Sequence, residues 1–332
     1  MNYIGSKYKL ASFISSEIIR VCGSAINKTY AELFGGTGAV ARVLKDRFKK
    51  VIVNDAEEYA YVLLRHYIGN TRFIDSIDKI YELNKIKPVK GFIYTNYCAG
   101  SGSGRNYFTD NNGMKVDAMR LQIEHWKNNR IASEDEYYLL LASLLECADA
   151  LANTASVYGA FLKQIKKSAS ASLHLTEAPY TKCQTETLVY KEDANQLIKK
   201  IKGDVLYLDP PYNQRQYGAN YHLLNTITLY DTFIPQGKTG LRPDYNRSAY
   251  CSRAQVAHAF DALIAAADFE FIFISYNNEG LLQEDILKKI CEQYGSYQLI
   301  RKNYQRFRAD KPDARQHKAS KTEEHLHVLI KK

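Results

Sequence analysis

The chain has 332 residues, enough for one large α/β domain with an insertion or for two modest domains. Apolar residues make up 45% of it, but no run of about 18 apolar residues occurs, which excludes a membrane-spanning helix. A net charge of +9 suits a polyanionic partner, and six scattered cysteines without a CxxC pair argue against a zinc site and a disulfide framework. We therefore expect a cytoplasmic protein with reduced thiols, no bound metal and no membrane contact.

The N-terminal part has the pattern of strand, glycine turn, helix and strand. A short apolar run at 30–34 leads into GGTG at 35–38, and residues 39–48 carry apolar side chains at helical spacing. A continuous apolar run at 51–55 then ends in Asp55, which is typical of a buried parallel strand. This βαβ unit predicts a doubly wound, mostly parallel α/β sheet whose ligand lies at the carboxyl ends of the strands.

Between 61 and 185 helical patterns replace the strands. Residues 137–151 are the clearest helix and 71–84 a weaker one. The segment 100–113, rich in glycine and asparagine, predicts a loop, and 163–174 predicts an exposed connector. No strand pair of the βαβ kind is evident, so we expect an inserted helical subdomain.

The α/β pattern resumes after residue 185. The expected elements are, in chain order, a strand at 187–193, a helix at 195–201, a strand at 204–209, a loop at 235–253, a helix at 255–267, a strand at 269–276, a helix at 281–294, and strands at 297–307 and 325–332. The last two strands are separated by a long charged segment. They predict a terminal antiparallel hairpin with a long basic tip.

The glycine turn at 35–38 suggests a ligand that approaches the backbone closely. It does not match the dinucleotide fingerprint GxGxxG, and no Walker lysine follows, so a phosphate cradle is not expected. Asp55 stands where doubly wound folds bind ribose hydroxyls. We expect a nucleoside cofactor with an amino-acid tail; a tight strand–helix turn and a helix-capping acid are the structural alternatives.

The strand at 204–209 ends in Asp209-Pro210-Pro211-Tyr212. Consecutive prolines have fixed φ and no N–H, so the turn is stiff and its carbonyls are available as acceptors. The Asp209 carboxylate and a proline carbonyl together suit an exocyclic amine with two hydrogens, and Tyr212 offers a flat ring for stacking. The alternative is a rigid turn with a helix-capping acid.

Two of these motifs, Phe34-Gly35-Gly36-Thr37-Gly38 and Asp209-Pro210-Pro211-Tyr212, resemble in this order the signature of S-adenosylmethionine-dependent DNA adenine N6-methyltransferases. The N-terminal Tyr3-Ile4-Gly5-Ser6-Lys7 resembles the first motif of that family. The order of the motifs, with a long insert between them, is that of the Dam-like, α-type group. Segments 104–113, 158–163 and 213–227 are similar to a subgroup of bacterial restriction-modification methylases.

The resemblance implies transfer of a methyl group from S-adenosylmethionine to N6 of a flipped adenine in a specific short double-stranded DNA sequence. It implies a catalytic methyltransferase domain at 1–60 and 186–332 and a helical target-recognition insert at 61–185. Methylation of adenine in RNA is the nearest alternative. A protein glutamine amide is a less suitable substrate, because Asn is usual there in place of Asp209. The intact motifs argue against a catalytically inactive nucleic-acid binder.

The same resemblance assigns the site residues. Those implied in catalysis are Asp209, Pro210, Pro211 and Tyr212. Those implied in cofactor binding are Tyr3, Ile4, Gly5, Lys7, Phe34, Gly35, Gly36, Gly38, Asp55, Asp193 and Asp209. Lys7 is expected near the methionine carboxylate of the cofactor. Asp193 either contacts the adenine amine of the cofactor from the end of its strand or caps the following helix.

DNA binding requires cations for the phosphates and side chains that reach base edges. Asn220, Tyr221 and His222 are expected to open a helix beside the pocket and to hold the flipped base or a phosphate; ordinary polar residues at a helix start are the alternative. The cationic candidates are Arg105, Lys163, Lys166, Lys167, Arg242, Arg247, Arg253, Arg308, Lys311, Arg315 and Lys318. We expect base reading by segments 60–185 and 235–253. A cognate restriction endonuclease would be a functional and not a physical partner, and the enzyme a monomer or dimer.

Overall fold

The computed structural model describes residues 6–277, 280–305 and 321–332, and the chain divides into two compact units. A sheet unit comprises Lys7–Ala56, Cys183–Gln216 and Arg247–Lys332. A helical unit consists mainly of Glu57–Lys182 and Tyr217–Asn246. No helix in the described part of the chain is both long and apolar enough to cross a membrane.

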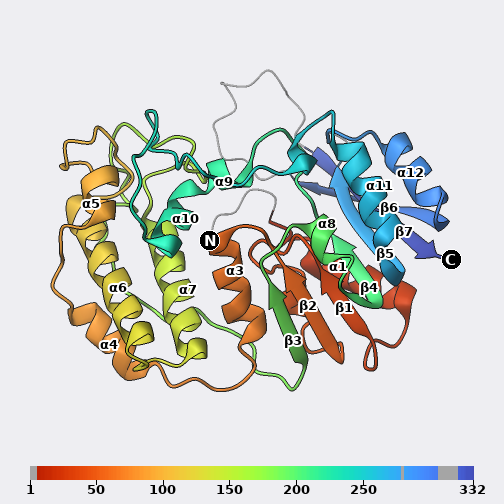
Figure 1. The fold of residues 1–332 in the computed structure, drawn as a ribbon, viewed down its shortest axis with the longest axis horizontal. Coiled ribbons are helices and arrows are strands. Elements are labelled where there is room, and N and C mark those ends of the chain that lie inside the picture. Colours follow the sequence, from red (N-terminus) through yellow and green to blue (C-terminus); the bar gives the residue numbers. More distant parts are fainter. Residues whose placement is uncertain (1–5, 278–279, 306–320) are drawn as a thin grey trace. The chain divides into compact units, whose positions relative to one another are not determined.

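The sheet unit is built on one seven-stranded sheet of order β3-β2-β1-β4-β5-β7-β6. The strands are β1 (Thr29–Glu32), β2 (Lys50–Asn54), β3 (Glu186–Tyr190), β4 (Lys202–Leu208), β5 (Asp268–Asn277), β6 (Gly295–Gln305) and β7 (Lys321–Lys331). The first five strands pair in parallel, whereas β7 runs antiparallel to both β5 and β6. The expected doubly wound sheet and terminal hairpin are thus confirmed (Figure 1). The expected basic tip lies largely outside the described residues.

Helices cover both faces of this sheet. They are α1 (Ala11–Cys22), α2 (Ala41–Leu44), α8 (Ala194–Leu197), the short 3-10 helix η2 (Ala249–Cys251), α11 (Val256–Ala266) and α12 (Glu284–Glu292). Residues of α8, α11 and α12 share one core with the strand residues Leu206 and Leu208. On the other face Tyr30 contacts the ring of Phe48, which follows α2, at 5.3 Å between centroids. Because side chains alternate along a strand, each strand supplies both cores.

The helix expected at 39–48 is shorter than predicted, since α2 spans only Ala41–Leu44. The Lys45 carbonyl accepts a hydrogen bond from the Thr185 hydroxyl at 2.7 Å, and the Arg47 N–H donates to Leu44 in a tight turn. These contacts replace the regular helical pattern and direct Phe48 toward the sheet.

The sheet brings distant motifs to one edge. β1 and β4 are neighbours, with Glu32 opposite Tyr207, and the strand order reverses between them. The carboxyl ends at such a reversal are where doubly wound sheets bind ligands. Since β7 runs in the opposite direction, its beginning lies at this same edge, where Glu324 pairs with Asn277 at the end of β5.

The helical unit contains the helices α3 (Glu58–Leu64), η1 (Arg65–Gly69), α4 (Ile77–Lys85), α5 (Phe92–Tyr97), α6 (Asp110–Asn128), α7 (Glu134–Leu151), α9 (Tyr217–Asn220) and α10 (His222–Leu229). The two long helices α6 and α7 lie side by side (Figure 1). α7 begins with a capping box, in which Ser133 and Glu136 each accept the backbone N–H of the other. The helix expected at 137–151 is confirmed as α7, and the one expected at 71–84 begins later, at Ile77, as α4.

The loop expected at 100–113 ends earlier, because α6 begins at Asp110. Thr109 caps the helix by accepting the N–H of Asn112. Gly113 lies in the first turns, and a Cβ at this position would come within 2.0 Å of the Cys98 sulfur. Asn112 and Gly113 disfavour a helix by propensity, but capping and close packing determine the conformation here.

The division of the chain differs from the predicted one chiefly in one segment. Tyr217–Asn246, which the predicted boundaries placed in the catalytic domain, belongs to the helical unit. Its helix α10 is buried there: Asn225 donates to Glu57 at 2.6 Å, and Arg120 donates to the Ile227 carbonyl at 2.9 Å. These partners are more than 100 residues away in sequence, so the order of motifs does not indicate them.

Candidate functional site

The glycine turn and Asp55 form one structural element. After β1, Gly35 donates to the Asn54 carbonyl at 2.8 Å, and Gly38 donates back to Gly35 at 2.7 Å. Gly36 and Gly38 have φ angles of 51° and 72°, which glycine adopts at no steric cost. The Gly36 N–H donates to Asp55 Oδ2 at 2.8 Å. The predicted cofactor turn and the predicted ribose acid are therefore held together directly.

Asn54, which the sequence analysis missed, connects the ends of three strands, β1, β2 and β3, by hydrogen bonds. Its buried amide donates to the carbonyls of Leu33 and Glu192, both at 3.0 Å, and its oxygen accepts the Glu192 N–H at 2.9 Å. The available signal was a polar residue inside the otherwise apolar run at 51–55. Such a buried amide needs partners on all its polar atoms.

Asp193 does not end a strand. β3 ends at Tyr190, so the expected strand at 187–193 is too long by three residues. The exposed Asp193 instead caps α8 by accepting the N–H of Gln196 at 3.1 Å. The structure thus shows the helix-cap alternative, and a contact with the cofactor stays a prediction.

The carboxylate of Asp209, just beyond β4, is bound by a buried lysine. Lys7 Nζ lies 3.0 Å from Asp209 Oδ1 and 3.1 Å from Glu324 Oε1. The side chains of Lys7, Asp209 and Glu324 are 7%, 16% and 1% exposed. Glu324 on β7 was not among the predicted residues, because only the antiparallel strand order brings it here.

The charged groups of this cluster shift one another's pKa values. Burial raises the pKa of Asp209 to about 6, with Lys7 lowering it and Glu324 raising it further. Burial lowers the pKa of Lys7, but Asp209 and Glu324 together hold it well above its ordinary value. Lys7 is therefore a permanent cation with two carboxylates of the chain as partners. A contact of Lys7 with the methionine carboxylate of the cofactor stays a prediction.

The rest of the Asp-Pro-Pro-Tyr turn is fixed by the loop after β5. The Tyr212 carbonyl accepts the N–H of Leu281 at 2.9 Å. The half-buried Tyr212 ring lies edge-on to Tyr276, with centroids 6.5 Å apart, and Lys7 Nζ is 5.6 Å from its centre. Tyr276 has a packing role, since its hydroxyl accepts the Leu282 N–H at 3.2 Å.

A second buried acid, Glu32 at the end of β1, was also missed. Its Oε2 accepts the Tyr30 hydroxyl at 2.9 Å, and its carboxylate also accepts the backbone N–H of Ala41. Burial raises the pKa of Glu32 to about 8, and the charges of Asp209 and Asp55 contribute to the rise. Glu32 is therefore mostly protonated near neutral pH, which limits the negative charge at this edge.

The comparison with known proteins identifies the family. A family model for D12 class N6 adenine-specific DNA methyltransferases matches residues 3–315. The chain belongs to this family. This methyltransferase transfers a methyl group from S-adenosylmethionine to N6 of adenine in DNA, as the sequence motifs indicated.

Similar proteins cover the whole chain. The type II methyltransferase M.NlaIII of Neisseria lactamica is 55% identical over 333 residues, which cover 100% of this chain and 99% of the relative. M.CviAII of Paramecium bursaria Chlorella virus 1 is 38% identical over 93% of each chain. M.FokI of Planomicrobium okeanokoites is 36% identical over 99% of this chain and 52% of the relative, so this chain spans about half the length of M.FokI.

The edge of the sheet fits a cationic nucleoside cofactor. Its acceptors for a ligand are the carboxylates of Asp55 and Asp209, while Glu324 pairs with the cation Lys7. Such a set suits the sulfonium, ammonium and ribose hydroxyl groups of S-adenosylmethionine. The glycines at 35, 36 and 38 are buried beside Asp55 and leave the backbone without side chains on this side of the turn. Phe34, half-buried and edge-on to Tyr250 at 4.9 Å, supports the turn.

Several predicted DNA-binding residues are instead structural. Tyr221 and His222 are fully buried in the helical unit, where His222 lies among the rings of Tyr97, Tyr107 and Tyr158. Burial lowers the pKa of His222 to about 4, so it is neutral near pH 7. These two side chains do not form a surface for a base or a phosphate.

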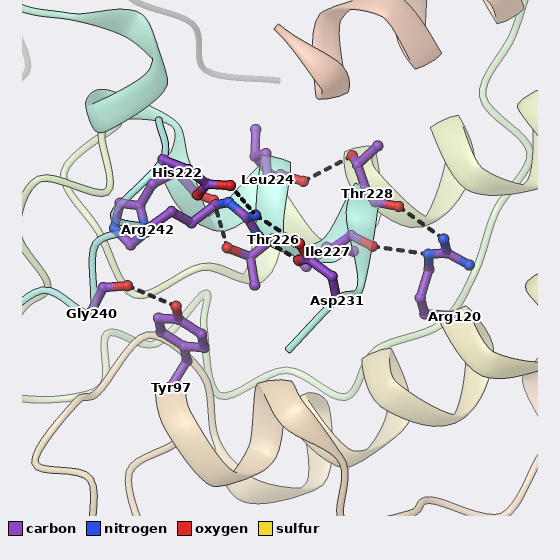
Figure 2. A network of polar contacts seen from close by, with 11 residues as sticks. Tyr97, Arg120, His222, Leu224, Thr226, Ile227, Thr228, Asp231, Gly240 and Arg242 are labelled. Atoms are coloured by element: carbon purple, nitrogen blue, oxygen red, sulfur yellow. Dashed lines mark hydrogen bonds and ion pairs between the residues drawn. The ribbon is translucent and has the colours of Figure 1, made fainter. Parts of the chain in front are cut away.

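Arg242 is also part of the interior. It binds both oxygens of Asp231, at 2.6 and 2.8 Å (Figure 2). It also binds Asp244 at 3.2 Å. Its guanidinium lies 4.4 Å from the centre of the Phe233 ring. Figure 2 also shows Arg120, another buried arginine, donating to the carbonyls at the end of α10.

Arg105 clamps a loop of the same unit. Its guanidinium donates to the carbonyls of Asn96 at 3.1 Å and of Gly237 at 3.1 Å, while the Tyr97 hydroxyl donates to Gly240 at 2.7 Å. The exposed candidates among the described residues are Lys163, Lys167, Arg247 and Arg253; Asn220 and Lys166 are half-buried. Tyr3, Ile4, Gly5, Arg308, Lys311, Arg315 and Lys318 lie outside the described residues.

Arg242→Ala is expected to lower the free energy of unfolding by about 2 kcal/mol, because it leaves Asp231 and Asp244 without their cation and removes packing on Phe233. Chemical denaturation measures the loss. The exposed Arg253→Ala is the control and should change stability by less than about 0.5 kcal/mol. Unchanged stability with weakened DNA affinity in Arg242→Ala would restore its role as a DNA contact.

Glu32→Gln is expected to make stability less dependent on pH. Because the folded-state pKa of Glu32 is raised to about 8, wild type loses stability as pH rises from about 5 to 8, by up to about 1.4 kcal/mol per pH unit. Glutamine does not titrate, so the variant should not share this loss. Its unfolding free energy should therefore increase relative to that of wild type as pH rises across this range. Denaturation at pH 5.5, 7 and 8.5 measures it. Glu270→Gln, at an exposed position, is the matched control, and parallel curves for Glu32→Gln and wild type would refute the expectation.

Proposed function

We propose that methyl transfer takes place at the carboxyl end of β4, where Asp209 and the Pro210 carbonyl hold the target N6 amine. One observation carries this proposal: the half-buried Asp209 is tied through Oδ1 to Lys7 at 3.0 Å. Among the described residues none donates to Oδ2 or to the Pro210 carbonyl. Two acceptors therefore remain for the two hydrogens of an amine.

The chemistry requires such acceptors because the N6 lone pair is delocalised into the adenine ring. Two hydrogen bonds from N6 favour a tetrahedral and more nucleophilic nitrogen. Bound S-adenosylmethionine supplies an electrophilic methyl group on a positively charged sulfur. Asp209 orients the amine, and placement of the two reactants accounts for much of the acceleration. Asp209 does not remove the proton in advance; the proton leaves N6 during or after transfer.

We assign cofactor binding to the glycine turn and its neighbours. Residues 34–38 would contact the amino-acid and ribose portions, and Asp55, fixed by Gly36, would accept from the ribose hydroxyls. The acceptor-rich edge supports this assignment. Lys7 has a different role here, because both its partners are carboxylates of the chain. It keeps Asp209 in place and offsets the cost of burying it.

The target adenine cannot be reached inside a duplex, so it must flip out of the stack. Tyr212 is the ring that would stack on the flipped base. Its carbonyl is fixed by Leu281, and its edge rests against Tyr276, so the half-buried ring is held in place before the base arrives.

We propose that the helical unit, Glu57–Lys182 together with Tyr217–Asn246, recognises the target sequence in DNA. The half-buried Arg105 and the buried Arg242 hold loops in fixed shapes, which suits a reading surface. Exposed Lys163, Arg247 and Arg253 are the candidates for phosphate contacts. The type II relatives support a restriction-modification role with a functionally linked endonuclease, as a monomer or dimer, in the cytoplasm with the cellular DNA.

Asp209→Ala is expected to abolish transfer of tritiated methyl groups from S-adenosylmethionine to duplex DNA while cofactor binding persists. In wild type the single-turnover rate should fall below about pH 6, since protonated Asp209 no longer offers two good acceptor atoms. We call this fall in rate toward low pH the acid limb. The side chain of Asp209→Asn does not titrate there, so the residual activity of this variant should lack the acid limb. Asp204→Asn, nearer the start of β4, is the control and should keep it. Normal turnover of Asp209→Ala would remove the proposed role.

Tyr212→Ala is expected to slow transfer by about 5- to 150-fold, because stacking on a base contributes ~1–3 kcal/mol. Tyr212→Phe retains the ring and should remain near the wild-type rate. A fluorescent 2-aminopurine at the target position, which brightens when unstacked from DNA, measures flipping directly. An unaffected rate and an unaltered fluorescence change in Tyr212→Ala would exclude stacking on this ring.

A further inference from the structure

Three charged groups from distant parts of the sheet unit meet in its interior. Lys7 precedes α1, Asp209 follows β4, and Glu324 belongs to β7. Lys7 Nζ is 3.0 Å from Asp209 Oδ1 and 3.1 Å from Glu324 Oε1. Glu324 is only 1% exposed, so its carboxylate has lost its water and depends on protein partners. Among the described residues Lys7 supplies its cation.

The antiparallel strand β7 is what delivers Glu324 to this place. A parallel strand would bring its carboxyl end to the site, whereas β7 brings its beginning, with Glu324 opposite Asn277 at the end of β5. The adjacent Glu323 is more exposed and pairs with Arg301 and His325 instead. Alternation along the strand therefore separates two neighbouring glutamates into different environments.

We propose that Glu324 is a positioning residue for methyl transfer, which holds the Lys7 ammonium on Oδ1 of Asp209 and so leaves Oδ2 to accept the target amine. This inference rests on the proposed role of Asp209. A lysine side chain has many rotamers, and one carboxylate alone does not fix its ammonium in direction. With Glu324 on its other side, Lys7 is held between two anions and keeps its contact with Oδ1.

The cluster also controls the charge of Asp209. The groups that face it are Lys7, Glu324 from β7, Tyr207 from β4, and Tyr30 and Glu32 from β1, while Tyr212 faces Lys7. Of the two groups in direct charge balance, Lys7 lowers the pKa of Asp209 and Glu324 raises it. Neutralising either partner should therefore shift the acid limb of the rate profile, and the two shifts should have opposite signs.

The experiment measures single-turnover methyl transfer to duplex DNA between pH 5 and 8, with S-adenosylmethionine saturating. Glu324→Gln should move the acid limb to lower pH by ~1 unit and lower the plateau rate on the order of tenfold. Lys7→Gln should move the limb to higher pH. The dissociation constant of the cofactor should change by less than about threefold in Glu324→Gln, because the positioned group is Asp209.

Glu323→Gln is the matched control, because it makes the same charge change one residue away. It should leave the pH of the acid limb unchanged. The double variant Lys7→Gln/Glu324→Gln tests whether Glu324 acts through Lys7. Its plateau rate should equal that of Lys7→Gln alone, since the second change removes a residue that has lost its target. This variant also removes both buried charges together, so it remains informative where Glu324→Gln alone does not fold.

The outcomes separate this inference from the proposed function. Normal transfer by Asp209→Ala would overturn both. An inactive Asp209→Ala together with a Glu324→Gln enzyme of wild-type rate and limb would overturn the role of Glu324 alone. A limb that moves to higher pH in Glu324→Gln, or additive losses in the double variant, would also overturn it.

Discussion

The burial of a carboxylate at the end of β4 is the constraint on which the site depends. Asp209 must be shielded from water to present a defined acceptor, yet an isolated buried charge is strongly unfavourable. Lys7 supplies the compensating cation at 3.0 Å, and Glu324 shares it from the opposite side. The excess of acceptors that results suits a cofactor whose reactive sulfur is positively charged. Glu32 is mostly protonated near neutral pH, so it adds little negative charge to these acceptors.

Strand direction determines which residues can take part in this arrangement. Parallel strands end at the same edge, so the turn after β1 and the motif after β4 become neighbours although more than 170 residues separate them. The reversal of β7 adds the beginning of the last strand to that edge. One sheet therefore collects the glycine turn, Asp209 and Glu324 without any of them being close in the chain.

Buried cations are also important in the helical unit, where they bind carbonyl and carboxylate groups of the chain itself. Arg120 binds the carbonyls at the end of α10, and Arg242 binds Asp231 and packs on Phe233. On the sequence alone, Arg242 was among the candidate DNA contacts, because DNA phosphates require cations. The structure removes Arg242 and the neutral His222 from the DNA surface and directs attention to exposed side chains such as Arg253.

The sequence by itself determined the parallel sheet, the terminal hairpin, the family and the motif residues, because apolar periodicity and motif order are local properties of a chain. It placed Asp193 at a strand end, although its cap on Gln196 is local. For Asn54 its signal was a polar residue in an apolar run, and for Glu324 it offered none, because the partners of both lie far away in sequence. Only the tertiary structure decided which charges lie in the interior and what they bind. The physical reason is that the cost of burying a charge, and the partner that offsets it, exist only once the strands are assembled.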